Sequence, residues 1–115
     1  MTAHDGTPFS AEDVKFWMNL HANPPEGRRP SRRAASLGSI ESIDVIDPLT
    51  LRVNLTSPTP RYLNSLSDPL LALAQPRHLY EPEIAAGNVD VEPKDVGFVG
   101  LGGFKMKEYE FPTYI

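Results

Sequence analysis

The sequence predicts a small α+β domain built from a capped helix, a β-hairpin and short helices. Apolar residues recur at helical spacing in the segment that follows Ser10. From Ile40 the apolar period changes to two, which is typical of strands. Further on, Pro60 and Pro76 each open a short segment that is expected to be helical. With 115 residues, the chain is one domain at most.

A turn and a capping pair precede the first predicted helix. Asp-Gly favours a turn because Asp hydrogen-bonds the backbone ahead and Gly accepts a positive φ. The proline two residues later delays the start of the helix. The hydroxyl of Ser10 is then expected to cap the helix, with an acidic partner three residues on in a capping box. The predicted structural motif comprises Asp5, Gly6, Thr7, Pro8, Ser10 and Asp13.

The first helix is expected to run from about Ala11 to Asn23, where two prolines forbid its continuation. Its apolar side chains repeat at i, i+3, i+4 and i+7, so one side of the helix should face a core. Trp17 lies on this side and is interpreted as a core residue rather than a stacking platform. The full stripe is Val14, Trp17, Met18 and His21.

Two runs that alternate apolar and polar residues predict the β-hairpin. Residues 47–50, Asp-Pro-Leu-Thr, fit a type I turn with Asp at the first and Pro at the second position. The apolar face of the hairpin is expected to be Ile43, Val45, Leu51, Val53 and Leu55.

The second half of the chain predicts shorter elements. Thr59 should cap a helix that starts at about Pro60, with Tyr62, Leu63 and Leu66 on its apolar side. Residues 70–74 fit either a buried strand or a buried turn. A second short helix is expected at residues 76–81, followed by an acidic loop over residues 82–95.

Glycines 97, 100, 102 and 103 make residues 97–104 a flexible stretch. Such a stretch can cradle phosphate only where it opens a helix. Here residues 104–107 alternate like a strand, which favours a turn at Gly100 and Gly102 over a phosphate site.

The loop after the first helix is basic. Guanidinium groups bind carboxylates in a bidentate manner, so the loop offers candidate ligand-binding residues. Because loops routinely carry charge, a solvated connection is the alternative interpretation. The candidates are Arg28, Arg29, Arg32 and Arg33.

Composition and motif spacing exclude several function classes. The chain has no cysteine, and its three histidines lack the spacing of a metal-ligand pair. No catalytic residues, metal or cofactor are therefore predicted. A net charge of −4 argues against a nucleic-acid partner. The chain contains neither an apolar run of about 20 residues nor the basic-then-apolar start of a signal peptide.

Residues 4–16 closely resemble the signature sequence of family 5 extracytoplasmic solute-binding proteins. They read His-Asp-Gly-Thr-Pro-Phe-Ser-Ala-Glu-Asp-Val-Lys-Phe. Residues 39–48 also resemble that family. At residues 76–78 the family has Pro-Lys-His, so Arg77 replaces a lysine. Residues 97–104 resemble its Pro-Val-Gly-Thr-Gly-Pro-Phe motif, but Phe98 and Gly103 stand where prolines are usual, and Leu101 replaces a threonine.

This resemblance implies a role in transport. It implies a small α+β subdomain of a periplasmic-binding-protein-like (type II) two-lobed fold, with residues 1–115 a partial first-lobe subdomain, incomplete at both ends. The full-length protein would be periplasmic or extracytoplasmic and membrane-associated. It would bind a peptide or small solute and deliver it to ABC permease subunits. The alternative is a truncated or stand-alone α+β interaction module with no transport role.

Overall fold

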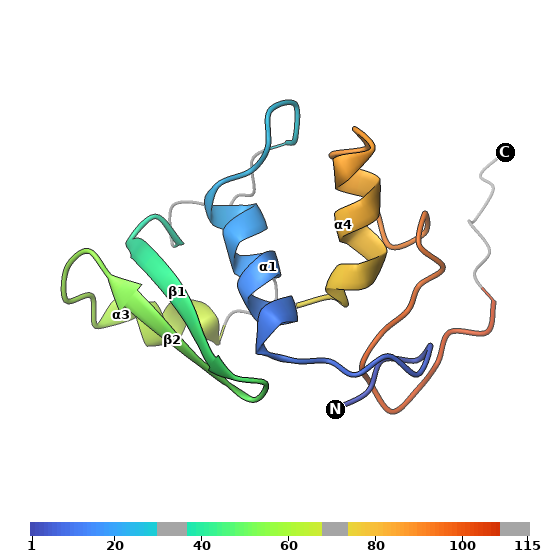
Figure 1. The fold of residues 1–115 in the computed structure, drawn as a ribbon, viewed down its shortest axis with the longest axis horizontal. Coiled ribbons are helices and arrows are strands. Elements are labelled where there is room, and N and C mark those ends of the chain that lie inside the picture. Colours follow the sequence, from blue (N-terminus) through green and yellow to red (C-terminus); the bar gives the residue numbers. More distant parts are fainter. Residues whose placement is uncertain (30–36, 68–73, 109–115) are drawn as a thin grey trace, which may run out of the picture.

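The computed structural model describes residues 1–29, 37–67 and 74–108. Within these ranges the strands form a two-stranded antiparallel sheet that is accompanied by helices, which confirms the predicted α+β class (Figure 1). In chain order the elements are α1 (Ala11–Ala22), β1 (Ile40–Asp47), β2 (Thr50–Leu55), α3 (Arg61–Leu66) and α4 (Arg77–Ala85).

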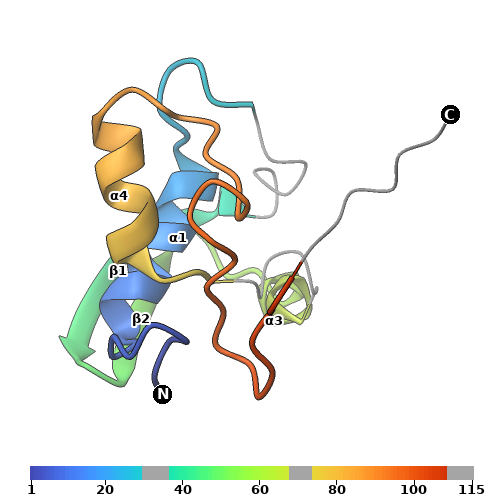
Figure 2. The same ribbon diagram turned by 90° about the vertical axis from the view of Figure 1, so that its right-hand side faces the viewer.

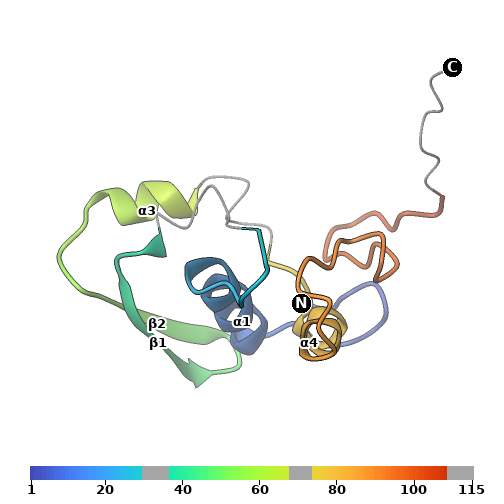
Figure 3. The ribbon, with the colours of Figure 1, turned by 90° about the horizontal axis from the view of Figure 1, so that it is seen from above.

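Helix α1 occupies the centre of the molecule. Seen from above, it lies between the β1–β2 hairpin on one side and α4 on the other (Figure 3). Helices α1 and α4 run side by side and in the same direction, so their N-termini lie together (Figure 1). The short α3 stands apart from this helix pair (Figure 2).

The core is small and collects residues from every part of the chain. Tyr80 on α4 is 1% exposed, and its ring meets the edge of Trp17 with 5.2 Å between ring centroids. Trp17 therefore packs as the core interpretation expects, but its stripe is only half-buried. Because α1 has neighbours on two sides, its most buried residues are Ala11, Asp13 and Leu20 instead.

The hairpin has the predicted register. Ile43 lies opposite Val53, so the apolar residues of the two strands pair across the sheet. In the turn, Asp47 Oδ1 accepts a hydrogen bond from the N–H of Leu49 at 2.8 Å. The carbonyl of Pro48 accepts the N–H of Ala11 at 2.9 Å. The hairpin turn is thereby fastened to the first residue of α1.

Two predictions about the later helices are wrong in detail. Leu63 is 74% exposed, so of the expected apolar side of α3 only Tyr62 is buried. Helix α3 begins at Arg61, so Pro60 rather than Thr59 directly precedes it, and the hydroxyl of Thr59 donates to the carbonyl of Ser57 at 3.0 Å. The segment from 70 to 73 lies outside the described residues.

Helix α4 continues through Pro82 to Ala85, where a loop was expected. A proline in a helix removes one hydrogen bond, from its own nitrogen to the carbonyl four residues back. Helical hydrogen bonding resumes after the proline, because the carbonyl of Pro82 accepts the N–H of Ala86 at 3.0 Å. Burial of Tyr80 anchors the turn that precedes the proline.

Residues 101–104 form bends, and the strand expected at residues 104–107 is not formed within the described chain. Phe104 is 96% exposed. Phe98 has a positive φ of 54° and donates its N–H to the carbonyl of Pro93 at 2.8 Å. A proline could do neither. A proline therefore does not fit position 98 in this turn.

Within the described part of the chain, no helix has the length and apolar character needed to cross a membrane.

Candidate functional site

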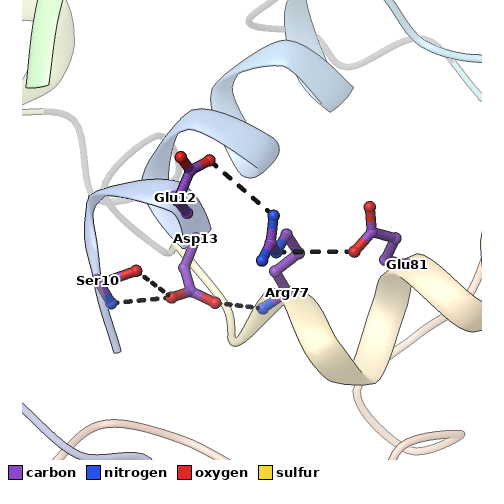
Figure 4. A network of polar contacts seen from close by, with 5 residues as sticks. All are labelled: Ser10, Glu12, Asp13, Arg77 and Glu81. Atoms are coloured by element: carbon purple, nitrogen blue, oxygen red, sulfur yellow. Dashed lines mark hydrogen bonds and ion pairs between the residues drawn. The ribbon is translucent and has the colours of Figure 1, made fainter. Parts of the chain in front are cut away.

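The carboxylate of Asp13 joins the N-termini of α1 and α4 (Figure 4). Its Oδ2 accepts the backbone N–H of Ser10 at 2.8 Å and the hydroxyl of Ser10 at 3.3 Å. Its Oδ1 accepts the backbone N–H of Arg77 at 2.7 Å. Ser10 and Asp13 thus form a capping box, and the same side chain also caps the second helix.

Charge explains why two helices can start side by side. Parallel helix dipoles bring two positive ends together, and a carboxylate placed between them offsets that charge. The side chain of Arg77 extends from the same point to Glu12 of α1 at 3.9 Å and to Glu81 of α4 at 3.6 Å. These two ion pairs are half-exposed, so the buried Asp13 contributes more to the arrangement.

The turn at residues 5–8 packs against α4. Gly6 adopts the positive φ of 90° that the Asp-Gly prediction requires. Asp5 Oδ1 accepts the N–H of Thr7 at 2.9 Å, and Oδ2 lies 2.6 Å from Nε2 of His78. The Thr7 hydrogen bond, with help from His78, lowers the pKa of Asp5 to about 2. Pro8 forms a bridge with Thr2 that closes the turn.

His4 links the same turn to the glycine-rich segment. Its backbone N–H donates to the carbonyl of Gly100 at 3.0 Å, and its ring Nδ1 accepts the N–H of Gly100 at 3.2 Å. Ring Nε2 lies 2.9 Å from the carbonyl of Gly102. A Cβ at position 100 would stand 3.3 Å from the imidazole ring, so the glycine permits the close approach.

The basic loop contacts the loop after α4. The guanidinium of Arg28 donates to the carbonyl of Val89. The backbone N–H of Arg29 donates to Asp90 Oδ1 at 3.0 Å, and its guanidinium lies 3.6 Å from Oδ2 of the same carboxylate. The side chain of Arg29 is nonetheless 90% exposed. Arg32 and Arg33 lie outside the described residues.

A depression of about 420 Å³ opens between these two loops. Its charged lining is balanced, with three cationic and three anionic side chains. The residues that line it are Arg28, Arg29, Asp90, Val91, Glu92, Lys94 and Asp95. Among the described residues no cluster of His, Asp and Glu could hold a metal ion. The arrangement suits polar contacts to a charged ligand.

Trp17 packs against two further aromatic rings, those of His21 and Tyr80. The ring of His21 meets the edge of Trp17 with 5.0 Å between centroids. Burial lowers the pKa of His21, and the nearby Arg28 lowers it further. Burial also raises the pKa of Tyr80. These shifts keep both rings uncharged at neutral pH, which suits a packing role.

The contacts of His4, His78 and Arg77 escaped the sequence analysis. Apart from the Arg77–Glu81 ion pair, their hydrogen bonds join residues 64 or more positions apart, so local spacing in the sequence does not predict them. One local feature could have indicated them: the Pro-Arg-His sequence places Arg77 and His78 at the start of a predicted helix.

Comparison with known proteins places these features in a wider context. The family model "Bacterial extracellular solute-binding proteins, family 5 Middle" matches residues 4–115. A putative ABC transporter peptide-binding protein of Brucella ovis is 31% identical over 112 residues. The glutathione-binding protein GsiB of Salmonella paratyphi A is 26% identical over 113 residues. The two alignments cover 97% and 96% of this chain but only 20% of each relative.

A solved structure has a similar fold. The crystal structure of NikZ from Campylobacter jejuni in complex with Ni(L-His) superimposes with a TM-score of 0.73 at 28% sequence identity. The superposition covers 95% of this chain and 20% of the NikZ chain. The chain thus corresponds to about a fifth of the proteins that it matches, in sequence and in structure.

Proposed function

Because the chain belongs to the bacterial extracellular solute-binding proteins of family 5, we propose that it forms part of the substrate-binding component of an ABC importer. The observation that carries this proposal is the family match over residues 4–115, supported by the superposition on NikZ. In this role the complete receptor closes two lobes around a solute and presents it to permease subunits outside the cytoplasm. Residues 1–115 supply one subdomain of the first lobe.

The solute is a peptide or a related amino-acid derivative. Three similar proteins are described by what they bind, namely a peptide, glutathione and Ni(L-His). All three ligands carry amino-acid groups. A receptor for such ligands needs cations for carboxylates and acceptors for ammonium groups.

Arg29 is the best candidate for a ligand contact among the described arginines. The guanidinium of Arg28 already donates to a backbone carbonyl, and its withdrawal would leave that carbonyl without a partner. The guanidinium of Arg29 is exposed, and its 3.6 Å contact to Asp90 is too loose to hold it firmly. Arg32 and Arg33 remain candidates of the same loop.

A segment exchange tests the transport role. Residues 4–115 would replace the matching segment of the Brucella ovis protein, and peptide binding would be measured by titration calorimetry with mixed di- to pentapeptides. The chimera should bind like its parent. A chimera that melts like the parent yet binds no peptide would overturn the proposal. Within the chimera, Arg29→Ala should weaken binding, whereas Arg52→Ala, on the exposed face of β2, should leave it unchanged.

A further inference from the structure

Two histidines hold the N-terminal turn, residues 1–9, to the rest of the molecule. His4 belongs to the turn and contacts Gly100 and Gly102. His78 belongs to α4 and contacts Asp5 of the turn. The two contacts impose opposite requirements on the protonation of the rings.

The His4 contact requires a neutral ring. Nδ1 accepts the N–H of Gly100, so it cannot itself carry a proton, and Nε2 must carry one to reach the carbonyl of Gly102. A second proton would sit on Nδ1 and face the N–H of Gly100. One hydrogen bond would be lost, and two donors would oppose each other at a contact distance of 3.2 Å.

The His78 contact has the opposite dependence. A protonated ring gains a charge-assisted hydrogen bond to Asp5, whose Oδ2 is 2.6 Å away. The pKa of Asp5 is lowered to about 2, chiefly by the N–H of Thr7 and then by His78. At pH 5 the carboxylate is therefore still ionised, so protonation of the His78 ring strengthens this contact.

Within the part of the chain that the structure describes, no ion pair compensates a charge on the His4 ring. This ring faces backbone groups of the glycine-rich segment. The carboxylate nearest in sequence, Asp5, is already bonded to Thr7 and to His78. The remaining charged groups of the turn, the glycine-rich segment and α4 are the Met1 ammonium, Lys105, Arg77, Glu81 and Glu83.

We propose that His4 is an acid-sensitive latch, which fastens residues 97–103 to the N-terminal turn while its ring is neutral and releases them once the ring is protonated. His78 keeps the turn on α4 while the latch opens. Histidine is suited to this because its charge changes between pH 5 and pH 8. The latch is a property of the fold and does not depend on which solute the receptor binds.

Amide hydrogen exchange tests the latch in the 115-residue chain. The protection factor of the Gly100 amide should fall about tenfold from pH 7.5 to pH 5.0, as one lost hydrogen bond requires. His4→Gln, which cannot titrate, should abolish this fall, whereas His78→Gln should preserve it. The nitrogen shifts of His4 at pH 7.5 should report a proton on Nε2 alone.

Three outcomes would overturn the latch. Equal protection of Gly100 at the two pH values would show that protonation does not break the contact. An equal fall in His4→Gln would assign the effect to another group. A matching loss of protection at the buried Tyr80 would mean that acid unfolds the whole molecule rather than one segment.

Discussion

Asp13 of α1 accepts the backbone N–H of Arg77 at 2.7 Å, so one buried carboxylate stands at the start of two parallel helices. The two residues are 64 positions apart in the sequence. This contact fixes α4 against α1 and thereby places the loops that follow each helix beside one another. The depression bordered by Arg28 and Asp90 lies between these two loops.

Loss of the Asp13 carboxylate should be strongly destabilising. Asp13→Ala leaves the N–H groups of Ser10 and Arg77 without partners, and hydrogen bonds to charged groups contribute about 1.5–3 kcal/mol each. We expect a loss of roughly 3 kcal/mol or more, measured by urea denaturation. Glu12→Gln is the matched control, since it removes a half-exposed carboxylate one residue away. Equal midpoints for the two variants would contradict the shared cap.

Ser10→Ala should cost about 1 kcal/mol, less than the loss of Asp13, because the backbone N–H of Ser10 keeps its bond to the carboxylate. The sequence alone predicts that Ser10→Asp is harmless. The structure revises this, since Ser10 Oγ lies 3.3 Å from Asp13 Oδ2 and a second carboxylate would face the first. Denaturation midpoints should therefore rank the parent above both variants, and a midpoint for Ser10→Asp equal to that of the parent would restore the simpler prediction.

Local signals predicted the parts of the fold whose causes are local. Ser10 and Asp13 are three residues apart, and Asp47 acts on Leu49 two residues away, so the cap and the hairpin turn could be inferred from spacing. The pairing of Ile43 with Val53 follows from the period of two and the position of the turn.

The candidate site could not be predicted in this way, because its contacts join distant parts of the chain. Nothing in the sequence pairs His4 with Gly100 or Asp5 with His78, which tertiary packing brings together. Packing also overrode propensity at Pro82, where the anchored Tyr80 keeps α4 helical. Leu63 was assigned to a buried side by pattern alone, yet within the described residues α3 has too few neighbours to cover it.

Substitutions in β2 should distinguish its two faces. Val53 lies opposite the buried Ile43, so Val53→Ser should cost about 1–2 kcal/mol by removing apolar contact and adding a polar group. Arg52→Ala, on the exposed face, should fall within about 0.5 kcal/mol of the parent. Thermal unfolding of both variants measures the difference. A larger loss of stability for Arg52→Ala than for Val53→Ser would mean that the register of the hairpin differs by one residue.

The lowered pKa of Asp5 predicts an acid-dependent loss of stability. The pKa of the Asp5 carboxyl is lower in the folded than in the unfolded chain, where it is 3.8. Such a group stabilises the fold at pH values above its unfolded pKa. That contribution disappears as the pH falls toward the folded pKa of about 2. Urea midpoints at pH 4.5 and pH 2.5 should therefore differ more in the parent than in Asp5→Asn. The variant should still lose some stability, because the Leu49 N–H also lowers the pKa of Asp47. An identical difference in parent and variant would show that Asp5 does not titrate as the structure requires.

The 115-residue chain alone should not bind peptide with useful affinity. In the proposed role the receptor encloses its ligand between two lobes. This chain corresponds to about a fifth of its relatives, so the remainder would supply most of the enclosing surface. Association itself costs roughly 4 kcal/mol or more, which an open depression lined by solvent-exposed charges does not offset. Exposed apolar side chains such as Leu49 and Phe104 should instead favour self-association.

Two measurements test these effects. Titration calorimetry with di- to pentapeptides compares binding by the chain and by the chimeric receptor, and light scattering follows the oligomeric state of the chain. Micromolar binding by the monomeric chain would contradict the expectation and would mean that the depression beside Arg29 binds ligand without a second lobe.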